Sequence, residues 1–118
     1  MTETILNKLF SGSATPEELL GRIRYAAAFQ QLCKCSESEL TAELGIAADT
    51  LAAWKLRPEW DDAVQAIRRK MYFMSSKLRL FIKEMAEIGP RDVQREAVEV
   101  VVDMAFPPAR HLEIHTKP

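Results

Sequence analysis

The chain has few of the residues from which catalytic and metal sites are usually built. Its 118 residues include 2 cysteines and 2 histidines. Cys33 and Cys35 are separated by one residue, and no second cysteine pair or nearby histidine completes a zinc site. His111 and His115 lack a neighbouring carboxylate cluster, which favours surface histidines. A glycine-rich phosphate loop is also missing. We therefore expect no catalytic residues, no metal site, no cofactor and no enzymatic activity.

Long apolar runs are missing as well. The longest, residues 25–29, is far shorter than the roughly 20 residues of a transmembrane helix, and the chain opens without a signal-peptide pattern. A hydrophobic content of 47% still suffices for a packed core. The composition predicts a small soluble protein of the cytoplasm with no membrane association.

The first strong helix signal is at residues 15–18. Thr15 can accept a hydrogen bond at the N-terminus, Pro16 suits the first helical position, and the acids that follow complement the helix dipole. We predict a helix from here to about Cys33, after an arm of residues 1–14. Its apolar side predicts packing on the next two helices, as the third member of a trihelical head. That side comprises Leu19, Ile23, Ala26, Ala27 and Leu32.

Residues 37–56 have the spacing of a helix-turn-helix. Gly45 stands where the first helix must turn sharply into the second, and glycine tolerates the positive φ of such a turn. Ser36 or Ser38 can cap the first helix, and Asp49 or Thr50 can act near the start of the second. The apolar set falls where the geometry requires it and consists of Leu40, Leu44, Ile46, Leu51 and Trp54.

This stretch resembles the small terminase subunits of tailed bacteriophages and related prophage proteins. The resemblance lies in Leu44-Gly45-Ile46, in Thr50-Leu51-Ala52-Ala53-Trp54 and in Pro58-Glu59-Trp60, and it continues through residues 90–97. It implies a non-catalytic protein that forms a homo-oligomeric ring, binds viral double-stranded DNA and presents it to a large terminase subunit. For a viral source, the resemblance implies the cytoplasm of the bacterial host.

A long helix is predicted over residues 58–88, because its apolar residues recur at alternating intervals of four and three. Such a seam is typical of coiled coils and favours oligomerisation. Further apolar residues beside the seam make it too wide for a two-stranded coil. The residues that we expect to form the oligomer contact are Val64, Ile67, Met71, Met74, Leu78 and Phe81.

After Gly89 and Pro90, a last helix is predicted that folds back as a hairpin. Its apolar face comprises Val93, Ala97, Val100, Val101 and Met104. The tail alternates at Leu112, Ile114 and Thr116, which fits a short strand paired with other copies or a frayed end. The predicted fold is therefore all-α, with an arm (1–14), a helix-turn-helix head (15–57), a helical hairpin for oligomerisation (58–106) and a tail (107–118) that a strand could occupy.

Positive charge is concentrated in the middle of the chain. Residues 55–83 contain 8 basic and 3 acidic side chains, whereas residues 1–54 contain 4 and 7. This central segment is the electrostatic footprint expected for DNA, although a solvated helix face explains it equally well. The residues that we expect to contact DNA are Thr50, Lys55, Arg57, Arg68 and Arg69.

The second helix of the unit is poor in base-reading side chains. Its outward positions are mainly alanines with Asp49, and none of these donates the paired hydrogen bonds by which Arg, Lys, Asn or Gln read bases. Three functions remain open: a terminase-like packaging protein, a dimeric transcription regulator that binds a palindromic site, and a helical interaction module that no longer binds DNA.

Overall fold

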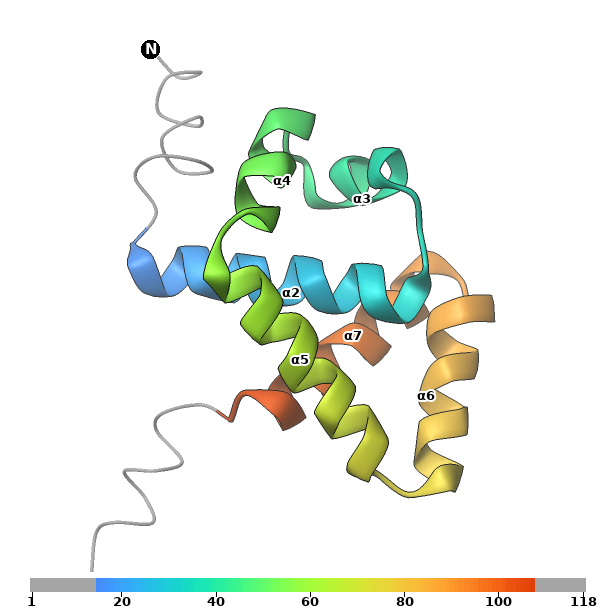
Figure 1. Ribbon diagram of the computed structural model, residues 1–118. Helices are drawn as coiled ribbons and strands as arrows, with labels where there is room; N and C mark the ends of the chain where they lie inside the picture. Colours follow the sequence, from blue (N-terminus) through green and yellow to red (C-terminus); the bar gives the residue numbers. More distant parts are fainter. Residues whose placement is uncertain (1–14, 108–118) are drawn as a thin grey trace, which may run out of the picture.

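The structure is a computed structural model, and it describes residues 15–107. Six α-helices make up this part of the chain (Figure 1). They are α2 (Pro16–Cys33), α3 (Glu37–Leu44), α4 (Ala48–Lys55), α5 (Pro58–Phe73), α6 (Ser76–Ile88) and α7 (Arg91–Ala105). The all-α prediction is confirmed for the described residues. The predicted arm, the predicted strand and both histidines lie outside them.

Helix α2 begins and ends where the sequence predicts. The Glu18 backbone N–H donates a hydrogen bond to Thr15 Oγ1 at 3.1 Å, and Pro16 occupies the first helical position. At the other end Lys34 adopts the left-handed conformation, with φ of 53°, and its N–H donates to the Gln30 carbonyl at 3.2 Å. This residue turns the chain away from α2 toward α3.

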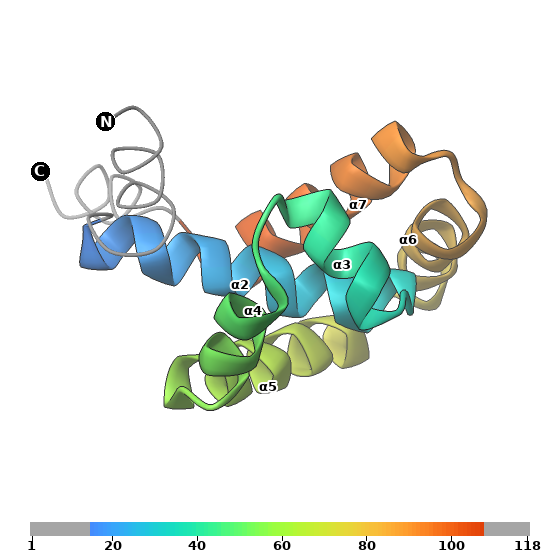
Figure 2. The same cartoon turned by 90° about the horizontal axis from the view of Figure 1, so that it is seen from above.

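The centre of the molecule is α2, which lies between α5 and α7 (Figure 2). Ala26, Ala27 and Ala28 are fully buried, and such small side chains allow neighbouring helices to approach closely. Phe29 fills the largest buried position on the same helix. The sequence predicts that α2 packs on α3 and α4 as the third member of the head, whereas in the structure its chief partners are α5 and α7. One hydrophobic cluster runs from α2 to α7, so residues on both sides of the predicted head boundary share a core.

The predicted continuous helix over residues 58–88 is wrong, because the chain breaks between α5 and α6. Met74 and Ser75 are extended, and Ser75 Oγ accepts a hydrogen bond from the Leu78 N–H at 3.2 Å, which starts α6. The Arg79 guanidinium then caps α5, donating to the carbonyls of Met71 at 2.8 Å and of Tyr72 and Met74 at 3.0 Å each. These carbonyls would otherwise lack helical partners.

This break also explains which predicted seam residues are buried. Two extended residues change the helical phase, so Ile82 rather than Phe81 faces the core on α6. Val64, Ile67 and Met74 are buried within this chain, and Met71 is half-buried. Leu78 and Phe81 remain exposed. Only this last part of the predicted seam therefore lies open on the surface of a single chain.

Gly89 and Pro90 end α6 and begin α7, as predicted. A Cβ atom on Gly89 would lie 2.5 Å from the Met85 carbonyl oxygen and 2.9 Å from Val93 Cγ1, so only glycine fits without movement. Helix α7 turns Val98 and Val101 fully into the core. The predicted Val100 is 47% exposed, and Val98 takes the place expected for it.

Candidate nucleic-acid interface

Two short helices, α3 and α4, lie together on one side of α2 (Figure 1). Ser36 caps α3: its hydroxyl accepts from the Glu39 N–H at 3.1 Å, and the Glu39 carboxylate accepts from the Ser36 N–H at 3.1 Å. The hydrogen bond that the carboxylate accepts from the Ser36 backbone N–H also lowers the pKa of Glu39. Of the two predicted caps, Ser36 is therefore the one used, and Ser38 is not.

Gly45 makes the turn between α3 and α4 with φ of 67°, as the sequence predicts. Its N–H donates to the Thr41 carbonyl at 2.9 Å. Ala47 precedes the first turn of α4, and no side chain caps that helix. Asp49 and Thr50 lie in the first turn of α4, near its start as predicted, but neither is the N-cap; Asp49 is exposed and Thr50 is half-buried.

The inner faces of α3 and α4 join the core of the molecule. Leu40 and Leu51 are fully buried or nearly so, and Trp54 is 5% exposed. Leu44 and Ile46 pack against them and are half-buried. Burial of these side chains turns the other side of α4 outward, and it carries Ala48, Asp49, Ala52 and Ala53. The predicted shortage of base-reading side chains on this face is thus confirmed.

Lys55, at the end of α4, is paired with a carboxylate of the same chain. Its ammonium forms an ion pair with Glu37 on α3 and lies 5.7 Å from the centre of the Trp60 ring. The Lys55 side chain keeps 26% exposure. A phosphate can reach this cation only at the edge of an existing ion pair, or by displacing the carboxylate.

Arg57 is paired in the same way. It precedes α5, and its Nη2 donates to Glu59 Oε2 at 3.0 Å. The hydrogen bond between them raises the pKa of the Arg57 guanidinium and lowers the pKa of the Glu59 carboxyl. The cation at the end of α4 and the cation directly after it are therefore both neutralised locally, which the sequence does not predict. Glu59 was visible two residues away, whereas the Glu37 contact depends on the fold.

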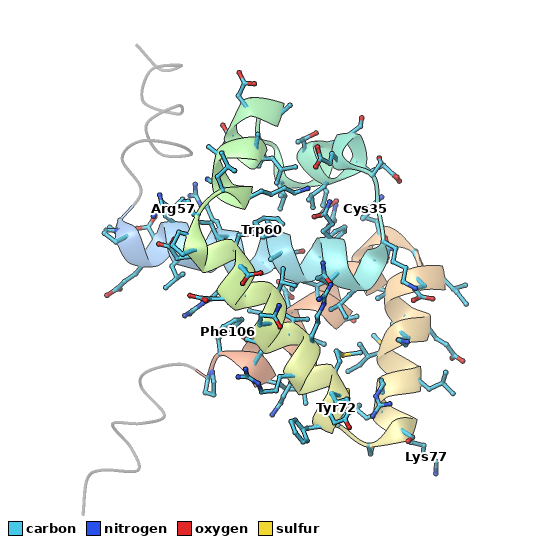
Figure 3. The ribbon with its side chains drawn as sticks, viewed as in Figure 1. Cys35, Arg57, Trp60, Tyr72, Lys77 and Phe106 are labelled. Carbon is cyan, nitrogen blue, oxygen red and sulfur yellow. The ribbon has the colours of Figure 1, made fainter. Side chains whose placement is uncertain are left out.

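The remaining predicted DNA contacts lie apart from α4. Arg68 and Arg69 are exposed on the C-terminal half of α5, and Arg68 Nε donates to Gln31 Oε1 at 3.3 Å. Figure 3 shows Arg57 and Tyr72 at opposite ends of α5, so these arginines belong to the end remote from α4. Of the predicted DNA contacts, Thr50 and Lys55 lie on α4 and Arg57 directly precedes α5, whereas Arg68 and Arg69 lie on the C-terminal half of α5.

A second polar cluster joins α2, α3 and α7. Glu43 receives hydrogen bonds from Arg95, and Arg91 lies 5.4 Å from the centre of the Phe29 ring. Nearby, burial raises the pKa of the Cys33 thiol to about 12. Burial also raises the pKa of the Cys35 thiol above its ordinary value. Both thiols are therefore protonated at neutral pH and are poor nucleophiles. The cluster acts as a structural junction between these helices.

Within residues 15–107, no three His, Cys, Asp or Glu side chains are grouped so that they could hold a metal ion. None of the described helices is long and apolar enough to cross a membrane. Comparison of the chain with protein families, curated proteins and solved structures finds no match. The function must therefore be argued from the α3–α4 surface and its surroundings.

Proposed function

We propose that this protein is a non-catalytic DNA-binding assembly protein similar to a phage terminase small subunit. It would bind double-stranded DNA through α3 and α4, assemble as a homo-oligomer, by the resemblance a ring, and present the DNA to a large subunit. The observation that carries the proposal is the α3–Gly45–α4 unit, with its capped first helix, its left-handed glycine turn and its second helix exposed along one side.

The outer face of α4 sets the mode of binding. Its alanines are small enough to lie against the floor of the major groove and can contact thymine methyl groups. They cannot distinguish bases by hydrogen bonds, because an alanine side chain has no donor or acceptor. Affinity must then come from phosphate contacts, which position a protein without specifying a sequence. We expect weak sequence preference and strong dependence on salt.

Lys55 and Arg57 would supply those contacts by exchanging their partners. In the free protein each is held by a carboxylate, Glu37 and Glu59 respectively. DNA phosphate must compete with these carboxylates and also repel them, so one subunit should bind weakly. Repetition of the same weak contact around an oligomer raises the overall affinity by effective concentration.

Fluorescence anisotropy with a labelled DNA duplex over a series of salt concentrations tests this function. Lys55→Ala/Arg57→Ala should weaken binding and lower the slope of log affinity against log salt by about 0.9 for each phosphate interaction removed. Glu37→Gln/Glu59→Gln should do the opposite and strengthen binding, because it frees the same cations. Arg68→Ala/Arg69→Ala is the matched control of equal charge loss at the remote end of α5. If Arg68→Ala/Arg69→Ala weakens binding as much as Lys55→Ala/Arg57→Ala does, the DNA-binding surface is not confined to α4 and includes the remote end of α5.

The second candidate is a helical interaction module that does not bind DNA. The neutralised state of Lys55 and Arg57 favours it, since ion pairs with Glu37 and Glu59 leave little net positive charge beside α4. If the Glu37→Gln/Glu59→Gln variant binds duplex DNA no better than the native chain, and both bind only at millimolar concentration, this module is the better description.

A further inference from the structure

Helix α6 presents an apolar surface to solvent on the side opposite the core. Ile82 is 2% exposed and Ala86 is fully buried on its inner side, whereas Leu80 is 60%, Phe81 59% and Ile88 80% exposed on its outer side. Figures 1 and 2 both place α6 at the edge of the molecule, with no other helix beyond it. Exposed aromatic and aliphatic side chains that are grouped in this way usually mark an interaction site.

Two opposite charges flank the apolar pair along one line of the helix. Lys77 and Glu84 are both exposed and are seven residues apart, which is close to two full turns, so they lie on the same side of α6. Leu80 and Phe81 stand midway between them, one on each side of the line that joins the charges. The outer face of α6 is thus positive, then apolar, then negative from its N-terminus.

This order is self-complementary for two antiparallel helices. Suppose that a two-fold axis passes between Leu80 and Phe81. A residue of one copy then lies at the same height along the helix axis as a residue of the other copy when their two residue numbers add up to about 161, the sum of 80 and 81. Lys77 of one copy then lies opposite Glu84 of the other, and the pair occurs twice. Leu80 meets its own counterpart within one residue's rise, about 1.5 Å, and so does Phe81. A two-fold interface requires such matching of a surface with itself.

We propose that α6 pairs antiparallel with α6 of a second copy about this axis. Pairing buries the exposed Leu80 and Phe81 in each chain. It also places a carboxylate beside Lys77, whose positive charge near the helix N-terminus is otherwise unfavourable with the α6 dipole. A shallow groove of about 530 Å³ on the same face can receive partner side chains; it is lined by Ser75, Lys77, Leu78, Leu80, Phe81 and Glu84.

This pairing rests on the proposed function, in which the protein assembles as a homo-oligomer, and it specifies one of the contacts between copies. A two-fold contact closes after two copies, whereas a ring needs a second, head-to-tail surface. The pair is therefore a dimer, or a joint between two larger assemblies.

Cysteine crosslinking of the full chain tests the geometry, on a background in which Cys33 and Cys35 are replaced by alanine. Leu80→Cys should form a disulfide between copies, because antiparallel helices 8–10 Å apart bring these positions within reach. Glu84→Cys, at another exposed position on the same face, should not crosslink with itself, since its copies would be about 10 Å apart along the axis. Mixing Lys77→Cys with Glu84→Cys should give a mixed crosslink.

Charge exchange provides an independent measurement by sedimentation equilibrium. Lys77→Glu or Glu84→Lys alone puts like charges together twice and should weaken association by roughly 3- to 30-fold. The double exchange, Lys77→Glu/Glu84→Lys, should restore it. A double variant that is as weak as the singles overturns the pairing.

The outcomes separate the pairing from the proposed function. If the native chain self-associates but Leu80→Cys crosslinks no better than Glu84→Cys, the α6 pairing is wrong and another surface assembles the protein. If the native chain is a monomer at every concentration, the pairing and the assembly in the proposed function both fail. DNA binding is decided by the anisotropy experiment alone.

Discussion

Arg95 on α7 donates a hydrogen bond from Nη2 to Glu43 Oε1 on α3 at 2.9 Å, and its Nε donates to the other carboxylate oxygen. Arg91, one turn earlier on α7, lies 3.9 Å from the same carboxylate. The Glu43 side chain is only 9% exposed. This paired contact holds the α3–α4 unit to the last helix of the chain, so the proposed DNA-binding surface and the rest of the fold form one body.

Glu43→Gln should lower the free energy of unfolding at neutral pH by about 1 kcal/mol, because the charged hydrogen bonds to half-exposed Arg95 are removed. The pKa of Glu43 is held below its ordinary value, chiefly by the hydrogen bond from Arg95. Its contribution is therefore complete above the unfolded pKa of about 4.3 and is lost as the pH falls through the folded pKa.

Chemical denaturation of the native chain and the Glu43→Gln variant at several pH values checks this prediction. The difference in stability should be constant from about pH 6 to 8 and should shrink below about pH 4.3. Using the difference removes the titration of carboxylates that both chains share. A difference that persists unchanged in acid would show that the carboxylate charge is not what joins α3 to α7.

The Arg79 cap offers a second test. Arg79→Lys keeps the charge but cannot reach three carbonyls at once, and Arg79→Ala removes all three hydrogen bonds at the end of α5. We expect each to lower stability by about 1–3 kcal/mol, with alanine the worse. Lys83→Ala, an exposed change on the same helix, should have little effect and serves as the control. Equal melting temperatures for all three variants would contradict the role of Arg79 as a cap.

Three glycines should respond to alanine in different directions. Gly21 lies inside α2 with open space around it, so Gly21→Ala should raise stability by about 0.5–1 kcal/mol. Gly45→Ala should lower it by about 1 kcal/mol, because φ of 67° is strained for alanine even though the space is free. Gly89→Ala should lower it by about 1–3 kcal/mol through contact with the Met85 carbonyl. Melting curves of the three variants give the order directly, and a stabilising Gly89→Ala would show that the α6–α7 turn relaxes easily.

The elements that the sequence predicts well are those with strong local signals. Thr15 with Glu18 and Ser36 with Glu39 specify helix starts by hydrogen bonds that span three residues, so no tertiary information is needed. The turn at Gly45 is likewise set by the backbone of one residue. The inner face of α4 was predictable from spacing, and that face determines which side of the helix is free to meet a ligand.

The break at Met74 and Ser75 was missed because the four–three spacing of apolar residues continues across it. The two serines at positions 75 and 76 are the only local sign of a break. They end the helix here because Arg79 donates hydrogen bonds to the carbonyls at the end of α5, and the sequence does not show that contact. The partners of Lys55 also come from the fold, since Glu37 lies 18 residues away. Charge counts along the chain could therefore locate a basic segment but could not show which of its cations are already neutralised.

Trp54 is predicted to act as a structural residue and not as a platform for stacked bases. It is 5% exposed and packs among core side chains beside Leu51. Trp54→Ala should cost about 3–5 kcal/mol, enough to unfold much of a small domain, and any DNA binding should disappear with the fold. Trp54→Phe keeps an aromatic in the same space and should retain most of the stability and the binding. A Trp54→Ala chain that melts at the native temperature but no longer binds DNA would instead make Trp54 a contact residue, which its burial argues against.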